Sequence, residues 1–203
     1  MNLGELRTAV SSRIAVPTAG DALAYDASID ACINAALRDI SSEQSWPWLL
    51  TSSSPTFAYG VAVIPTGCGR IKTFAIDGLP VPQASLEDVL SGAKQWVWAE
   101  DGASIRLSPT PSSTPTATLW YYRVEPTLVR DADLPLLPVV HHQTLVARAS
   151  YHLNVRRSDA TRVAADLAEY ERGLKNMMQS VHRGTSPKVI RSAYRDQATA
   201  RWT

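Results

Sequence analysis

The sequence predicts an α+β fold with a four-helix bundle core, an antiparallel β-rich insertion between helices 2 and 3, and an extended C-terminal tail. Three observations support this prediction. Apolar residues recur with a helical period at both ends of the chain, the period changes to two in the middle, and the last 20 residues are basic. We therefore expect a helical bundle from residues 1–50 and 135–183, a β-rich insertion at residues 51–134, and a separate arm at residues 184–203.

The first 50 residues predict two helices. Residues 2–15 have four apolar positions at helical spacing, before Pro17 and Gly20 end the segment. These positions are Leu3, Leu6, Val10 and Ile14. A second helix is expected to begin near Asp26, whose carboxylate can cap free amide groups, and to end at about Glu43. Its apolar face consists of Ile29, Ile33, Leu37 and Ile40.

Trp46-Pro47-Trp48 is expected to end the second helix. The segment from Thr51 to about Pro126 is expected to fold as an antiparallel sheet of about five strands, folded back over itself. Asp77-Gly78 and Asp101-Gly102 each lie between short apolar runs, and Asp-Gly allows the positive φ angles of a tight hairpin turn. The expected strand segments are Phe57 to Ile64, Ile71 to Ile76, Leu79 to Val81, Trp96 to Glu100, Ser104 to Leu107 and Thr116 to Val124. One or two helical turns are expected at Leu86 to Leu90.

Two further helices are expected after a linker bounded by prolines. These prolines are Pro126, Pro135 and Pro138. Helical spacing returns over about residues 139–156, and Ser158 or Asp159 can cap a last helix. The apolar positions of this helix follow a heptad pattern, which predicts packing along a neighbouring helix with its leucines buried. This helix-packing seam consists of Val163, Leu167, Tyr170, Leu174, Met177 and Val181.

The C-terminal arm differs in charge from the rest of the chain. It carries four basic residues against one acidic residue, Asp196, so its net charge is +3; the whole chain carries +1, which leaves −2 for the remainder. Gly184 and Pro187 are expected to interrupt the preceding helix. The arm would then leave the bundle and need a partner to cover its apolar side chains.

The composition argues against several functional classes. A near-neutral charge and a pI of about 7.8 give the whole molecule no electrostatic reason to bind nucleic acid or an anionic membrane. No apolar run approaches the roughly 18 residues of a membrane span, so we expect a soluble protein made in the cytoplasm. Cys32 and Cys68 lie in unlike contexts, and no disulfide is expected.

No pattern indicates an active site, a metal or a cofactor. His141 and His142 are adjacent, so on a helix their rings would point about 100° apart and could not share one ion. Asp131 and Asp133 lie in the linker and are interpreted as a solvated turn. Cys68 stands between two glycines, and no base is suggested nearby. We therefore expect a protein that is not an enzyme.

The tryptophans are the most distinctive residues. Trp46, Trp48 and Trp120 are interpreted mainly as core residues. Trp96 and Trp98 lie two apart in a predicted strand, and they are expected to share one face of it. There they either seal the sheet or form an exposed contact patch, and the sequence leaves both alternatives open.

The order of these elements resembles the head-to-tail adaptor (connector) proteins of tailed bacteriophages. The most specific pieces are Ile29 to Ile40 followed by Ser45-Trp46-Pro47-Trp48, and Leu134 to Pro138 leading into an alanine-rich helix that ends near Arg156. With Tyr170 to Leu174 and the basic arm, the likeness covers nearly the whole chain. The sequence looks like the group that includes the tail tubular protein A of short-tailed phages and the connector proteins below the portal in long-tailed phages.

This resemblance implies a structural protein in the neck of the virion, between head and tail, assembled in the host cytoplasm. It implies a homo-oligomeric ring of about 12 subunits that binds the portal protein and tail or nozzle proteins, with DNA only as passing cargo in the channel. The arm would dock on the portal, and Trp96 with Trp98 would form a possible tail-facing patch. The portal-docking residues would be Val189, Ile190, Arg191, Tyr194, Arg195, Arg201 and Trp202.

An alternative from a different class is a DNA-binding module that uses the basic C-terminal arm. Such a module needs positive charge together with aromatic stacking or a groove-reading helix, and only Tyr194 and Trp202 could stack there. A second alternative is an enzyme without a recognisable motif.

Overall fold

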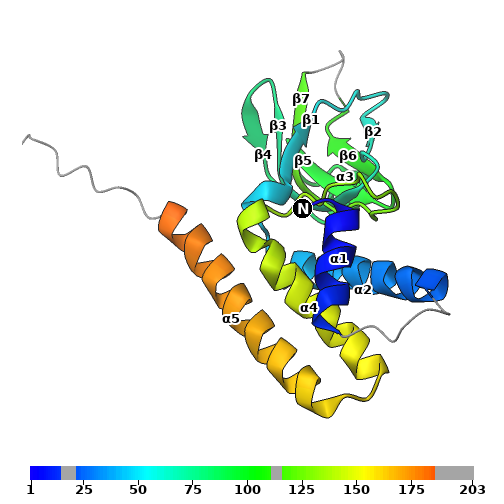
Figure 1. Cartoon of the computed structure of the whole chain (residues 1–203). Coiled ribbons are helices and arrows are strands. Elements are labelled where there is room, and N and C mark those ends of the chain that lie inside the picture. Colours follow the sequence, from blue (N-terminus) through cyan, green and yellow to red (C-terminus); the bar gives the residue numbers. More distant parts are fainter. Residues whose placement is uncertain (15–21, 111–115, 186–203) are drawn as a thin grey trace, which may run out of the picture.

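The computed structural model describes residues 1–14, 22–110 and 116–185. Within these residues, five α-helices and a set of antiparallel strands form a helical layer with a β part at one end (Figure 1). The mixed α+β class with an antiparallel β insertion is thus confirmed.

Two helices open the chain, as predicted. The first, α1 (Leu3–Arg13), begins with a capping box in which Asn2 Oδ1 accepts from the Glu5 amide at 2.9 Å and the Glu5 carboxylate accepts from the Asn2 amide at 3.0 Å. The second, α2 (Ala22–Glu43), begins before the predicted Asp26 and ends where predicted. All the apolar positions predicted for both helices are buried: Leu3, Leu6, Val10, Ile14, Ile29, Ile33, Leu37 and Ile40.

The Trp46-Pro47-Trp48 motif forms a packed joint between the helical layer and the β part. A 3-10 turn, η1 (Pro47–Leu49), follows the end of α2. Trp46 is fully buried, its Nε1 donates to the Ile40 carbonyl, and its ring stacks on Trp48 with 4.6 Å between ring centroids. The motif therefore ends the helix by packing as well as by its proline.

The described β part has seven strands in two sheets, where the sequence predicted one sheet of about five. One sheet has the order β1-β7-β3-β4 and the other the order β2-β6-β5. The strands are β1 (Leu50–Ser53), β2 (Val61–Val63), β3 (Cys68–Ile76), β4 (Leu79–Val81), β5 (Val97–Asp101), β6 (Ser104–Ser108) and β7 (Ala117–Arg123). A short helix, α3 (Leu86–Ser91), lies between the two predicted hairpins.

Local turns and one distant pairing account for the differences. The predicted strand from Phe57 to Ile64 is interrupted by a tight turn at Tyr59-Gly60, which leaves only β2. β1 was not predicted, because its partner β7 lies far along the chain. The second hairpin forms, but Asp101 pairs with Ser104, so the turn lies one residue later than predicted.

The second half of the helical layer is a helix hairpin. Its elements are η2 (Val139–His141), α4 (His142–Arg156) and α5 (Ala160–Thr185). The Asp159 carboxylate caps α5 by accepting from the Arg162 amide at 3.2 Å. The prediction that Gly184 ends the last helix was wrong, since Gly184 lies within α5, which continues to Thr185.

The helices pack around α4, which contacts α1, α2 and α5. Figure 1 shows α4 and α5 as an antiparallel pair, whereas α2 runs across α4. A bundle of four helices with roughly aligned axes is therefore not confirmed.

A single glycine allows α5 to approach α4 closely. A Cβ atom at Gly173 would lie 2.8 Å from Thr144 Cγ2 and closer still to its Oγ1, and real Cβ atoms do not approach so near. Thr144 is itself buried, so it has little room to move. Close packing along the hairpin thus depends on the missing side chain of Gly173.

We predict that Gly173→Ala lowers the free energy of unfolding by about 1–3 kcal/mol, because the added methyl overpacks the α4–α5 contact. On an exposed helix the same change would raise stability by up to about 1 kcal/mol. Urea denaturation checks the sign. Thr144→Ala should restore part of the loss in a double-mutant cycle, and additive effects of the two substitutions would contradict the close contact.

Candidate functional site

The helix-packing seam of α5 faces the hydrophobic core of the helical layer over most of its length. Tyr170 and Met177 are buried. The other seam residues in contact with this core are only half-buried: Leu167, Leu174 and Val181. Val163, at the start of the helix, does not join the core cluster. The prediction that the leucines are buried was wrong, because α5 packs on the layer from one side only.

A polar cluster joins α2, α4 and α5 beside this seam. The Asp39 carboxylate accepts from Arg148 Nε at 2.7 Å and lies 2.8 Å from His152 Nε2. The Arg148 guanidinium lies 4.7 Å from the centre of the Tyr170 ring, on α5, and 4.9 Å from that of Tyr151. Burial raises the pKa of Tyr170 to about 12. One arginine therefore connects three helices.

The C-terminal end of α1 is fixed to the helix hairpin by arginines. Arg13 Nη2 donates to both carboxylate oxygens of Glu169, at 2.6 and 2.7 Å. Arg157, just after α4, donates to the Ile14 carbonyl at 3.0 Å, which satisfies an end carbonyl of α1. Together these contacts place α1 against both helices of the hairpin.

The proline-bounded linker packs on the helical layer. Leu128 and Leu137 belong to its core, and Asn34 of α2 exchanges two buried hydrogen bonds with the Leu128 backbone, at 2.8 and 3.0 Å. The carbonyls of Asp131 and Asp133 accept from the first amides of α1. The interpretation of these aspartates as a solvated turn was therefore incomplete, because they also fix the start of α1.

His141, His142 and His152 have structural partners. His142 is buried, with Nδ1 2.8 Å from the Met1 amino group and Nε2 2.9 Å from the Leu137 carbonyl, and burial lowers its pKa. The His141 ring lies against Trp48, with 5.8 Å between centroids. Among residues 1–14, 22–110 and 116–185, no group of three His, Cys, Asp or Glu side chains is placed to hold a metal ion. Burial raises the pKa of Cys68, the reverse of what a reactive thiol requires.

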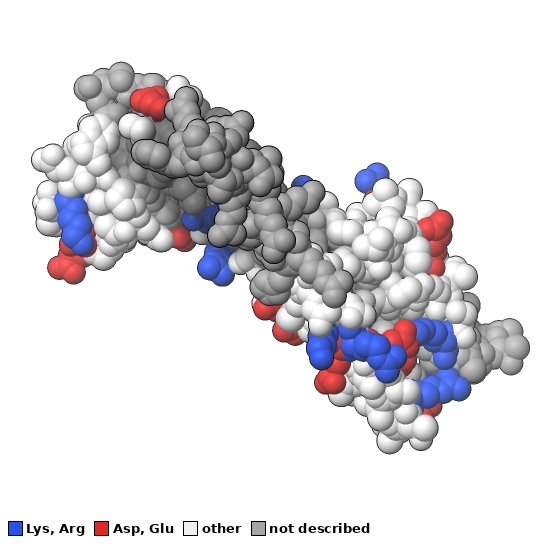
Figure 2. Space-filling view, turned by 90° about the vertical axis from the view of Figure 1, so that its left-hand side faces the viewer, with Lys and Arg blue, Asp and Glu red and all other residues white. Residues whose placement is uncertain are grey.

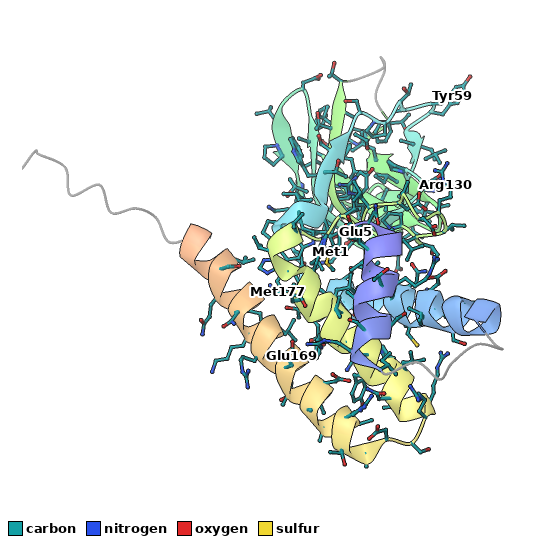
Figure 3. All side chains as sticks on the ribbon, viewed as in Figure 1. Met1, Glu5, Tyr59, Arg130, Glu169 and Met177 are labelled. Atoms are coloured by element: carbon teal, nitrogen blue, oxygen red, sulfur yellow. The ribbon has the colours of Figure 1, made fainter. Side chains whose placement is uncertain are left out.

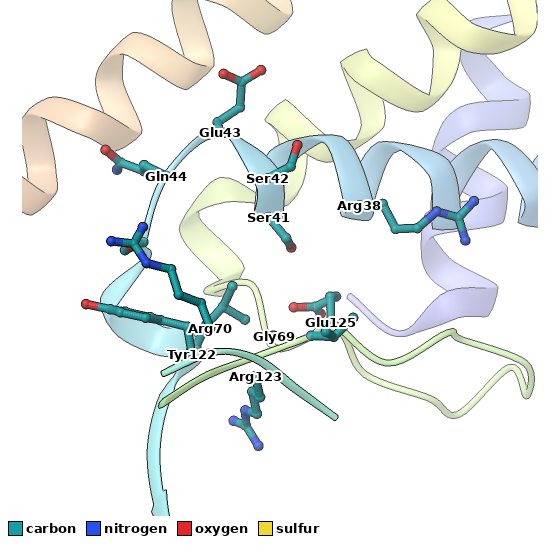
Figure 4. A pocket seen from close by; sticks show the side chains of 13 residues that line it. Arg38, Ser41, Ser42, Glu43, Gln44, Gly69, Arg70, Tyr122, Arg123 and Glu125 are labelled. Carbon is teal, nitrogen blue, oxygen red and sulfur yellow. The ribbon is translucent and has the colours of Figure 1, made fainter. Parts of the chain in front are cut away.

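A cleft of about 390 Å³ lies where the end of α2 meets β3 and β7 (Figure 4). Arg70 donates to Ser45 Oγ at 3.2 Å on its wall. Glu125 is buried in the wall, and its Oε1 accepts from the Leu136 amide at 2.6 Å. Burial raises the pKa of this carboxyl group. No histidine or cysteine is among the described residues that line the cleft, so the cleft lacks the usual base for a serine nucleophile.

The two tryptophans of the predicted patch do not share a face. Trp98 is 3% exposed, and its Nε1 donates to the Val81 carbonyl at 3.0 Å. Trp96 is 59% exposed and lies just before β5, with a positive φ of 56° that breaks the strand alternation. The prediction that both occupy one face was therefore wrong. Trp120, interpreted as core, is half-buried on the outer side of β7.

All the portal-docking residues implied by the resemblance lie outside the described residues: Val189, Ile190, Arg191, Tyr194, Arg195, Arg201 and Trp202. The same holds for Pro187. Of the arm, the structure describes only the last helical positions, Gly184 and Thr185.

The model of the SU10 adaptor protein family matches residues 1–192, which include both the helical layer and the β part. The chain belongs to this family. It is thus a structural adaptor protein of bacteriophages that takes part in tail assembly, and its place is in the phage particle. No curated protein matches the sequence. In the part of this adaptor that the structure describes, no helix is both long and apolar enough to cross a membrane.

Sequence reasoning missed two features of this adaptor. The cleft depends on contacts between α2 and strands distant in the sequence, so no local pattern indicates it. The exposed turn at Tyr59-Gly60 did have a local signal, because an isolated glycine inside a predicted strand indicates an interruption of that strand. The strand interpretation overrode that signal.

Glu125 should make the stability of the adaptor depend on pH. Because burial raises its pKa in the folded state, the folded protein binds the proton more tightly than the unfolded chain, so stability falls as the pH rises above about 4.3 and through the raised pKa. Glu125→Gln keeps an acceptor for the Leu136 amide and removes the charge. We predict that urea midpoints between pH 4.5 and 7.5 fall less steeply with pH in this variant.

The matched control is Glu171→Gln, on the exposed face of α5. It should follow the wild-type profile. If Glu125→Gln also follows it, Glu125 is not buried as described.

Proposed function

We propose that this protein is a subunit of the head-to-tail adaptor ring of a tailed phage, where it joins the portal to the tail in the neck and lines the DNA exit channel. The observation that carries the proposal is the family match, which spans residues 1–192 and so covers both structural parts of the chain. An adaptor must bind a different partner at each end, and a helical layer joined to a separate β part suits that task.

The length of α5 supports a docking role for the C-terminal arm. It has 26 residues against 15 in α4, so it is longer by about 16 Å at 1.5 Å per residue. Its C-terminal end stands clear of the rest of the molecule (Figure 1). An arm that begins there can reach a neighbouring portal without disturbing the helical core.

The distribution of charge supports a channel that DNA passes without being held. The chain before the arm is net negative, and Figure 2 shows acidic and basic side chains interspersed among the described residues of the face that includes α5. Tight binding of a phosphate backbone would require clustered lysine and arginine.

A ring subunit needs two different surfaces that meet on neighbouring copies, since such interfaces close only around a symmetry axis. We infer that assembly of the ring of about 12 depends on concentration or on the portal. Analytical ultracentrifugation with and without the purified portal of the same phage tests this inference. A chain that stays monomeric at high concentration and with the portal present would contradict the ring.

We predict that a chain ending at Thr185 keeps its melting temperature within about 2 °C of the full chain, because the removed residues 186–203 follow the last residue of α5. It should no longer sediment with the portal. Tyr194→Ala with Arg195→Ala should reproduce most of that loss, whereas Gln197→Ala with Thr199→Ala, in the same arm, should not.

Portal attachment that survives the truncation would move the contact to the helical layer. Submicromolar binding of the full chain to DNA at low salt, lost with the arm, would instead favour the DNA-binding alternative.

A further inference from the structure

A tight turn beside β2 presents an aromatic residue in an unfavourable backbone conformation. Ala58 and Val61 exchange two backbone hydrogen bonds, at 2.9 and 3.0 Å, across Tyr59 and Gly60. Tyr59 has φ 53° and Gly60 has φ 77°. Turns with two positive φ angles favour asparagine or aspartate followed by glycine, and a bulky aromatic residue is unusual there.

The β3–β4 turn of the same molecule follows the usual preference. Asp77 and Gly78 have φ 48° and 80°, so they occupy the same conformation as Tyr59 and Gly60. Packing of the Tyr59 side chain does not offset this strain, because the side chain is 97% exposed and points outward at the margin of the β part (Figure 3). The fold therefore gives no reason for a tyrosine at this position.

Trp96 is a second exposed aromatic residue with a positive φ angle. It has φ 56° and is 59% exposed, although Trp98, two residues later, is buried in the β core. Among the described residues, the other non-glycine positions with positive φ are Asp77 and Ser158, which are small and polar. The two aromatic residues with this strain are thus both exposed to solvent.

The strand register places Tyr59 and Trp96 at the same end of one sheet. β2 and β5 flank β6, and both run antiparallel to it, so both begin beside the C-terminal end of β6. The Leu107 amide donates to the Gly60 carbonyl there. Two strand spacings separate the backbones of Tyr59 and Trp96, about 10 Å.

The basic side chains near the two rings are paired with carboxylates, and Arg106, opposite Val61 on β6, is bound by Asp101 at 2.5 Å. The strand end between them continues into Ser108, Pro109 and Thr110. The charged residue nearest to Trp96 along the chain is Lys94, and its ammonium group is paired with Asp88 at 2.8 Å. With these charges paired, the surface offers no cluster of like charges that would favour phosphates or a strongly charged peptide.

We propose that Tyr59 and Trp96 form a contact surface for a protein partner that presents an uncharged, apolar segment. Exposed aromatic residues supply much of the binding energy in protein interfaces, and backbone strain that the fold does not require is typical of functional positions. Resting on the proposed function, the partner is the tail. Tyr59 lies on a different side of the molecule from the C-terminal end of α5, where the proposed portal-binding arm begins (Figures 1 and 3), and the strand register places Trp96 at the same sheet end as Tyr59.

Substitution by asparagine separates binding from folding, because asparagine tolerates positive φ. Tyr59→Asn, Trp96→Asn and the double variant should melt at or above the wild-type temperature. Purified tailless heads of the same phage, loaded with each variant, are mixed with purified tails, and joined particles are counted by electron microscopy. The double variant should load onto heads normally and reduce joining at least about tenfold, the effect of losing one strong interface contact.

Two matched controls accompany the series. Asp77→Asn changes the equivalent turn, and Leu79→Ser removes another exposed apolar side chain of the β part, 72% exposed. Both should join tails as the wild type does.

Normal joining by the double variant overturns the proposal. So does a loss of head loading or of self-association, which would assign the surface to the portal or to a neighbouring copy. If heads loaded with the wild-type protein fail to bind tails, the proposed function fails, whatever the variants do.

Discussion

Burial of α4 among α1, α2 and α5 is the constraint on which the rest of the structure depends. The buried face of α4 is rich in small side chains, including Thr144, Ala147, Ala149 and Ser150, and these let its neighbours approach closely. Gly173 of α5, which has no side chain, likewise allows α5 to approach α4 closely. With the hairpin closed in this way, Arg148 can reach both Asp39 and the Tyr170 ring. The direction of α5, and so the starting point of the arm, follows from this packing.

The linker connects the helical layer to the β part. It is hydrogen-bonded to Asn34 of α2, and its carbonyls at residues 131 and 133 accept from the first amides of α1. Strand β7, immediately before it, turns Tyr121 toward the β core and Tyr122 toward the helical core. The two parts are therefore connected on both faces of one strand, and by the stacked tryptophans that precede β1.

Local periodicity was sufficient to predict the positions of the helices and the inward faces of α1 and α2, since each depends on residues three or four apart. The Asp77-Gly78 hairpin and α3 were equally local. The pairing of β1 with β7 was not predictable, because no short pattern records a partner so distant in the sequence. The prediction that Trp96 and Trp98 share a face failed for another reason. Alternation of side chains assumes an extended backbone, and the positive φ of Trp96 changes the direction of its side chain. The candidate contact surface is thus visible only in three dimensions.

The separation of the hydrophobic residues into one helical cluster and two clusters of the β part has an evolutionary consequence. No described residue belongs to both the helical cluster and a β cluster, and substitutions that share no neighbours usually act independently. Changes at the exposed end of the β part are therefore not expected to weaken the packing of α4. A lineage of such phages could alter one end of the subunit to suit a new partner while inheriting the other end intact.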